Sequence, residues 1–283
     1  MARLWSSGFE LQSVTNGVEW DTTTGSPTID TTTKRSGVAS LRCNPEASWW
    51  YVTKRFATSD VLYGRAYVRV ASYPTTPAGI MAFWQQGGGN FGIIRMTSTG
   101  VLQLIEGWNN TQIGSNSSAL SLDTDYRIEL FVNVTTGTWS LEAKIDGTSF
   151  ASGTVVASDG GGGNNFDVGV GVENTSETAD LYFDDTAVND NTGTAQNSWP
   201  GAGSIVHMHP NATGDNSGGT YTGAATGWEC LDEVTPDDVT TRVALTVINT
   251  DILDVNCEAS SVPGIGASDT ITLVQVGTRL SAT

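Results

Sequence analysis

Apolar and polar residues alternate along short segments of this chain, which is the pattern of β-strands that bury one face. In the segment 126–134 the apolar positions are Tyr126, Ile128, Leu130, Val132 and Val134. The segment 139–145 repeats the pattern with Trp139, Leu141, Ala143 and Ile145. Because the polar turn 135–137 lies between them, the two segments predict a β-hairpin.

Further strands are predicted where the same alternation or a short apolar run returns, at residues 66–70, 79–86, 91–97, 101–106, 166–173 and 180–188. Glycine- and asparagine-rich turns separate these segments. No segment has the spacing of an amphipathic helix that could form βαβ crossovers. The sequence therefore predicts an all-β fold, an antiparallel β-sandwich or jelly roll.

The pattern changes after Asp190, and this change predicts a second domain. Beyond a stretch without periodicity, the candidate strands are residues 204–209, 240–248, 252–257 and 270–276. We therefore predict a jelly-roll domain over residues 1–190, a linker or docking strap over 191–203, and a smaller β-rich anchoring segment over 204–283. So few strands leave open edges, and we expect a neighbouring chain, or docking on the first domain, to complete the last segment.

The net charge of the chain excludes some classes of binding partner. The 283 residues include 13 basic and 30 acidic ones, a formal net charge of -17, which repels nucleic-acid phosphates and anionic membranes. No stretch approaches the roughly 20 apolar residues of a membrane span, and the first residues lack the apolar core of a signal peptide. Synthesis in a cytoplasm without Sec-type export is the expectation. Three cysteines predict buried thiols, with a bridge between Cys230 and Cys257 as the alternative.

Four stretches of the first domain carry a family resemblance. They are the opening Gly8-Phe9-Glu10, the segment 36–41, the hairpin ending in Ile145-Asp146-Gly147, and the closing segment 181–188. Through them, about two-thirds of the chain resembles the concanavalin-like lectin/glucanase superfamily in its LamG-like form. The resemblance implies a concanavalin-like jelly roll. Galactose-binding jelly rolls of carbohydrate-binding modules share the Phe-Glu opening and the Asp-Asp closing strand.

The last part of the chain carries a second resemblance. Its features are residues 198–201, Trp228 and the acidic stretch 232–238. With these it is similar to a region that follows such domains in tail- and head-associated proteins of bacteriophages. The resemblance implies a protein on the exterior of a virion, attached to the tail or decorating the capsid. Its implied partners are other virion subunits and further copies of itself, because virions assemble with symmetry.

The sequence lacks the residues that catalysis on this fold would need. Glycoside hydrolases of the superfamily use a Glu-x-Asp-x-x-Glu strand, and no segment of the chain has that pattern. The two histidines, His207 and His209, have no Gly-x-Ser-x-Gly elbow to accompany them. Their spacing fits a metal-ligand pair on one face of a strand, with solvent-facing alternation as the alternative. We therefore predict a protein that is not an enzyme.

Two aromatic residues lie beside amides and flexible loops, as in many sugar-binding sites. Trp84 lies two residues before Gln86, and Trp108 lies two residues before Asn110. Aromatic rings give flat platforms for sugars, while amides bond to their hydroxyl groups. The four residues are therefore candidates for contact with a host-surface glycan. The alternative for both rings is packing in a core or an interface.

Three carboxylates are candidates for a structural calcium site. Glu10 belongs to the opening stretch, whereas Asp184 and Asp185 belong to the closing one. The first and last strands of a jelly roll lie side by side, so the three side chains could supply oxygen ligands to Ca²⁺. Solvated or capping carboxylates are the alternative. No other cofactor is expected.

Two functions follow from these observations. The first is a non-catalytic structural protein of a bacteriophage particle, serving assembly, stabilisation or adsorption to the host surface. The alternative is a carbohydrate-binding module of an extracellular glycan-processing system, which the fold and the tryptophans favour equally well. The missing export signal favours the first.

Overall fold

The chain is described here by a computed structural model. The structure describes residues 2–57, 59–85, 89–107, 109–135, 137–156, 166–173, 178–234, 240–246 and 251–274. These residues form two compact units. The first contains the described residues up to His207 together with 233 and 234, and the second contains Met208–Asp232 and the described residues from 240 onward.

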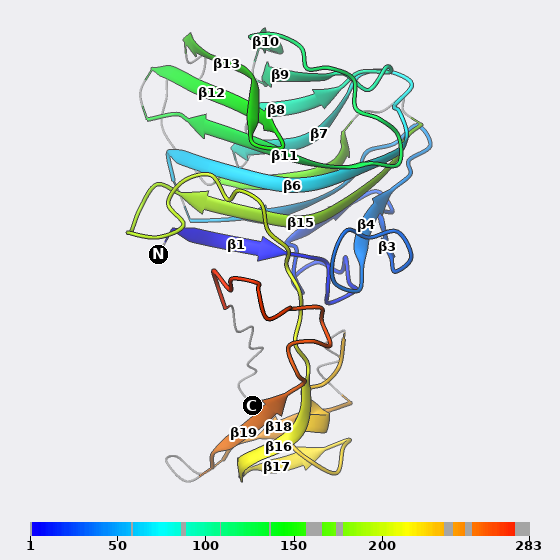
Figure 1. Cartoon of the computed structure of the whole chain (residues 1–283), viewed down its shortest axis with the longest axis vertical. Helices are drawn as coiled ribbons and strands as arrows, with labels where there is room; N and C mark the ends of the chain where they lie inside the picture. The colour runs from blue at the N-terminus through cyan, green and yellow to red at the C-terminus, as the bar shows by residue number, and fades with distance from the viewer. Residues whose placement is uncertain are drawn as a thin grey trace. The chain divides into compact units, whose positions relative to one another are not determined.

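The first unit is a sandwich of two antiparallel sheets, seen as stacked layers in Figure 1. Sheet A contains, in spatial order, β13 (Thr148–Val156), β12 (Thr138–Ile145), β11 (Asp125–Asn133), β6 (Val61–Ser72), β15 (Asp180–Asp190), β4 (Ser40–Cys43) and β3 (Thr28–Asp30), with β1 (Arg3–Ser7) paired to β15. Sheet B contains β10 (Thr111–Ile113), β9 (Leu102–Glu106), β8 (Asn90–Met96), β7 (Ala78–Gln85), β14 (Phe166–Glu173), β5 (Trp50–Arg55) and β2 (Thr22–Thr24). The predicted all-β antiparallel sandwich is confirmed.

Strands far apart in the sequence pair at the centre of each sheet. In sheet A, β15 lies beside β6 and also pairs with β1, with Ser7 opposite Thr186. In sheet B, β14 lies between β7 and β5. The expectation that the first and last strands lie side by side is therefore confirmed. Among the described residues, no helix is both long and apolar enough to span a membrane.

The core lies between the two sheets and contains the residues that the alternation predicts. Apolar side chains of the predicted hairpin lie in it, and Trp139 is 1% exposed. The ring of Trp139 packs edge-on against Phe91, with 5.2 Å between centroids. Trp20 stacks on Phe9 at 5.3 Å and meets Trp5 at 4.4 Å. Burying each such ring stabilises the fold by about 1.5–3 kcal/mol, so the core accounts for much of its stability.

The second unit contains two small antiparallel pairs and one short 3₁₀ helix. They are β16 (Pro210–Ser217) with β19 (Leu253–Cys257), β17 (Thr220–Thr222) with β18 (Arg242–Ala244), and η1 (Trp228–Cys230). The expected strand over 240–248 is thus shorter, and residues 270–274 are not a strand. Cys230 is buried and Cys257 is exposed, and no disulfide joins them, so the alternative of a bridge between the two is wrong.

The strand predicted over residues 204–209 is wrong. These residues belong to no sheet, and the first strand after them starts at Pro210. Their polar groups are bonded to side chains: Ser204 Oγ accepts a hydrogen bond from Arg35, and the Ile205 amide donates to Asp185. Contacts with side chains replace a sheet ladder here. The strand face that His207 and His209 were expected to share does not exist.

Candidate functional site

Part of the outer face of sheet A is covered by the chain itself. Trp199 packs on the rings of Tyr63 and Phe131, at 5.5 and 6.0 Å between centroids. The carbonyl of Gly201 accepts a hydrogen bond from Arg65 at 3.0 Å. Residues 196–205, here called the strap, therefore lie across this sheet. A small depression beside the covered part, lined by Tyr67, Arg69 and Tyr182 among others, contains no tryptophan, so we examine the outer face of sheet B for a ligand surface.

Strand β14, an interior strand of sheet B, has two glycines on its outer face. Val168, Val170 and Val172 of β14 point into the core. Because side chains alternate along a strand, the intervening Gly169 and Gly171 lie on the outer face. Two glycines on one face let neighbouring side chains pack directly on the backbone of β14, and both glycines are buried.

Aromatic side chains flank these glycines. Trp84, at the end of β7, lies over Gly169, where an added Cβ would come within 2.3 Å of its ring. Tyr51 of β5 lies 5.2 Å from Trp84 and 6.1 Å from Trp49 between ring centroids. Trp49, Tyr51 and Trp84 therefore form an aromatic row on the outer face of sheet B.

A shallow depression adjoins the aromatic row. It is lined by Tyr51, Gly79, Ile80, Met81, Ala82, Trp84, Gly169, Val170, Gly171 and Glu173. Glu173 is the only ionisable carboxyl among these lining residues, and burial raises its pKa to about 7. A carboxyl group with this pKa can both donate and accept hydrogen bonds near neutral pH.

Four amide side chains lie on strands β9 and β10 and in the segments beside β10, on the side of β7 away from β14. Gln103 Nε2 donates to Gln112 Oε1 at 3.0 Å and to Asn116 Oδ1 at 3.2 Å, and Gln112 Nε2 donates to Asn116 Oδ1 at 2.8 Å. Arg95 of β8 donates to Gln103 Oε1 and to Asn110 Oδ1. We call Gln103, Asn110, Gln112 and Asn116 the amide group. Mutual bonds hold these side chains in defined positions on the sheet.

The arrangement fits recognition better than hydrolysis. Glycosidases place two carboxyl groups about 5–9.5 Å apart. The two carboxylates of β14 on this face, Asp167 and Glu173, are six residues apart on one strand, or about 20 Å. Asp167 also forms a bidentate ion pair with Arg55, at 2.9 and 3.0 Å. Neither is placed to act with the other on one bond.

The structure brings two of the four predicted glycan residues onto this face. Trp84 belongs to the aromatic row, and Asn110 is exposed, left-handed at φ 53°, and bonded to Arg95. Gln86 and Trp108 lie outside the described residues. Sequence reasoning missed Tyr51, Gly169 and Arg95, because their faces depend on which strands become neighbours.

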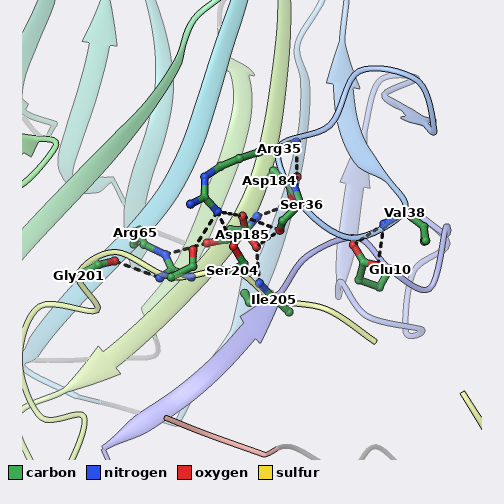
Figure 2. Close-up of polar contacts among 11 residues, drawn as sticks. Glu10, Arg35, Ser36, Val38, Arg65, Asp184, Asp185, Gly201, Ser204 and Ile205 are labelled. Carbon is green, nitrogen blue, oxygen red and sulfur yellow. Dashed lines mark hydrogen bonds and ion pairs between the residues drawn. The ribbon is translucent and has the colours of Figure 1, made fainter. Parts of the chain in front are cut away.

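The three predicted calcium ligands lie near the crossing of the strap and β15, where protein donors surround them (Figure 2). Asp184 accepts from the amides of Arg35 and Ser36 at 2.9 and 3.1 Å, and Glu10 accepts from the Val38 amide at 2.9 Å. Among the described residues no group of three or more His, Cys, Asp or Glu side chains has a metal-binding arrangement. The calcium site stays a prediction, with no observed feature in its favour.

Asp185 is the centre of the contacts between strap and sandwich. Its carboxylate is 0% exposed, pairs with Arg35, and accepts from Ser36 Oγ at 2.9 Å and from the Ile205 amide. Its carbonyl accepts from Arg65 Nε at 2.9 Å. Figure 2 shows these bonds converging on one residue. Burial and the neighbouring charge of Asp185 raise the pKa of Asp184 to about 8.

No protein-family model and no curated protein matches the chain. Among solved structures, the chain is similar to the receptor-binding domain of botulinum neurotoxin type G, with 12% identity, a TM-score of 0.43, and coverage of 61% of this chain and 43% of the other. It is also similar to the binding domain of botulinum neurotoxin DC in complex with SialylT, with 10% identity, a TM-score of 0.45, and coverage of 66% and 48%. A third is the receptor-binding domain of botulinum neurotoxin D, with 12% identity, a TM-score of 0.45, and coverage of 66% and 49%.

The chain thus spans less than half the length of these structures. At these identities and TM-scores the likeness says nothing about function, so the function of this chain has to follow from its own residues.

Proposed function

We propose that this chain is a non-catalytic binding protein whose sandwich binds carbohydrate on the outer face of sheet B. The observation that carries the proposal is the packing of Trp84 and Tyr51 around Gly169 and Gly171. Half-buried aromatic rings that pack on a glycine backbone give an apolar platform on which the C–H face of a sugar can stack. The amide group supplies fixed hydrogen-bonding partners for hydroxyl groups on the same sheet.

The absence of catalysis is part of the proposal. It is supported by the separation of Asp167 from Glu173, which leaves no acid and base positioned on one glycosidic bond. It is also supported by the ion pair that occupies Asp167. Incubating the protein with the oligosaccharide it binds should therefore release no shorter product. Turnover detected by mass spectrometry would contradict this part.

Binding should depend on Trp84. We expect wild-type protein to give signals on an array of oligosaccharides, and Trp84→Ala to weaken binding of the strongest one about 30-fold by calorimetric titration, the effect of removing an aromatic hot spot worth about 2 kcal/mol. Trp199→Ala is the matched control, because that ring lies on sheet A. Array signals that are equal for wild type and Trp84→Ala would refute the proposed face.

A second candidate function is the one that the phage resemblance implies, a structural protein on the exterior of a bacteriophage particle. It is favoured by the apolar side chains that the second unit exposes. These side chains are 53–76% exposed: Leu245, Ile252, Val262, Ile271 and Val274. Such exposure favours contact with another subunit, and adsorption to a host-surface glycan would unite both functions.

The oligomeric state tests this second candidate. We expect the purified chain to form an oligomer in light scattering, because association would bury the exposed apolar residues. Val262→Asp with Ile271→Asp should shift it toward the monomer. A wild-type protein that stays monomeric at high concentration would contradict assembly through its own copies.

A further inference from the structure

The guanidinium of Arg95 is held by amides and still has donors available. A guanidinium has five N–H groups. Nε and Nη2 donate to Gln103 Oε1 at 3.1 and 3.0 Å, and Nη1 donates to Asn110 Oδ1 at 2.9 Å. Three of the five donors are therefore used. The remaining two can serve a ligand on the outer face of sheet B.

Arg95 differs from comparable arginines in what balances its charge. Arg42 and Arg55 form bidentate pairs with Asp180 and Asp167, and those carboxylates raise the pKa of both arginines. Burial instead lowers the pKa of Arg95. In the part of the chain that the structure describes, no carboxylate forms an ion pair with Arg95. Arg3, which donates to the amide oxygens of Asn189 and Gln196, is held in a similar way, but Arg95 is the one that lies on the outer face of sheet B.

The amide group fixes the orientation of this cation. Gln103 gives its carbonyl oxygen to Arg95 because its nitrogen is bonded to Gln112 and Asn116. Neutral carbonyl oxygens hold the guanidinium in place without neutralising it. Preorganised, uncompensated guanidinium donors suit a planar carboxylate, which they can bind with two parallel hydrogen bonds.

The position of Arg95 on the sheet connects it with the depression. Arg95 lies opposite Gly79 of β7, and Gly79 lies opposite Glu173 of β14. Neighbouring strands are about 4.8 Å apart, so a sugar above Gly79 has Arg95 on one side and Glu173 on the other. Gly79 lacks a side chain that would separate them. The strands of Arg95 and Glu173 are two strand spacings apart, so a ligand carboxylate bound to Arg95 would lie about 10 Å from the Glu173 carboxyl group.

We propose that Arg95, oriented by Gln103 and Asn110, binds the carboxylate of an acidic sugar in the glycan recognised by sheet B. The ligand class is therefore an oligosaccharide with uronic acid or similar carboxylated units. This inference rests on the proposed carbohydrate-binding function. It assigns to a charged residue the part of specificity that stacking on Trp84 cannot provide, because every sugar presents a C–H face.

An array of matched neutral, carboxylated and sulfated oligosaccharides tests the inference. We expect wild-type signals to concentrate on carboxylated sugars, and the strongest of these to bind at least about tenfold more tightly than its methyl ester, which lacks the charge. Arg95→Gln should lose this preference and bind the ester as wild type does. Arg95→Lys should keep part of it, and Arg242→Gln, an exposed arginine of β18, should keep all of it.

The outcomes separate the two proposals. Wild-type binding confined to neutral sugars, a stronger preference for sulfated sugars, or an acid preference retained by Arg95→Gln would overturn the Arg95 site and leave sheet B as a glycan face. No wild-type signal on any sugar would overturn both. Far-ultraviolet circular dichroism and thermal unfolding of each variant distinguish loss of the site from loss of the fold.

Discussion

Replacing Asp185 by alanine should lower the free energy of unfolding by about 3–5 kcal/mol, the usual effect of removing one partner of a buried ion pair. The carboxylate is 0% exposed and bonded to Arg35, Ser36 and the Ile205 amide. Its removal takes this acceptor from the half-buried Ser36 hydroxyl and Ile205 amide, whereas Arg35 keeps the Gly203 carbonyl and the Ser204 hydroxyl as acceptors. The strap should loosen as well, because the lost bond of the Ile205 amide connects it to the sandwich directly, and Arg35, which also bonds to the Gly203 carbonyl, loses its ion pair.

Chemical denaturation measured by tryptophan fluorescence gives this free energy. Asp185→Asn separates charge from shape, since asparagine keeps one acceptor oxygen and tolerates the left-handed backbone at φ 50°. Asp21→Ala is the matched control: the carboxylate of Asp21 is 38% exposed and pairs with Lys54 on the surface, so it should cost less than about 1 kcal/mol. If Asp185→Ala and Asp21→Ala lowered the free energy of unfolding equally, the buried contacts of Asp185 would not stabilise the fold more than a surface ion pair does.

The protein should become less stable as pH rises from about 4.5 to 8. Burial raises the pKa of Glu10, Glu19 and Glu173 to about 7 and that of Asp184 to about 8. The folded chain therefore keeps protons that the unfolded chain releases near pH 4–4.5, and this contribution to stability is lost as pH rises through the folded pKa values. We expect unfolding at pH 8 to need at least about 3 kcal/mol less than at pH 5.

Glu19 offers the clearest test of this dependence. Its Oε2 atom is buried without a hydrogen-bond partner among the described residues, so its charged form is poorly compensated. Glu19→Gln should flatten the pH dependence by about 2–3 kcal/mol between pH 5 and 8. Glu46→Gln, on an exposed residue, should leave the slope unchanged. A wild-type stability that rises toward pH 8 would contradict the expected direction.

The sandwich could be predicted because its signal is local. Ile128, Leu130 and Val132 alternate with polar residues, and this alternation alone separates core from surface. The hairpin of β11 and β12 has few residues between its strands, so the partner was also evident. The segment 204–209 shows the limit of this signal. It has the same alternation, but its backbone amides at Ile205 and His209 donate to the side chains of Asp185 and Glu258 and not to a neighbouring strand.

The candidate site could be predicted only in part because it depends on non-local pairing. Trp84 was recognised from the amide and loop beside it. Tyr51 and Gly169 come from strands about 120 residues apart, and only the register of β14 against β5 and β7 places them together. Arg95 has no local sequence signal either. It is notable because no carboxylate forms an ion pair with it among the described residues, and because it bonds to Gln103 on the neighbouring strand β9.

Nuclear magnetic resonance with the strongest-binding oligosaccharide locates the ligand directly. Titration into ¹⁵N-labelled protein should shift the indole N–H signal of Trp84 and the backbone amide signals of Gly169 and Gly171. The indole signals of Trp20 and Trp139, which are buried in the core, should stay in place. Shifts confined to sheet A, to the strap or to the second unit, with those of Trp84 and the two glycines unchanged, would contradict carbohydrate binding by sheet B.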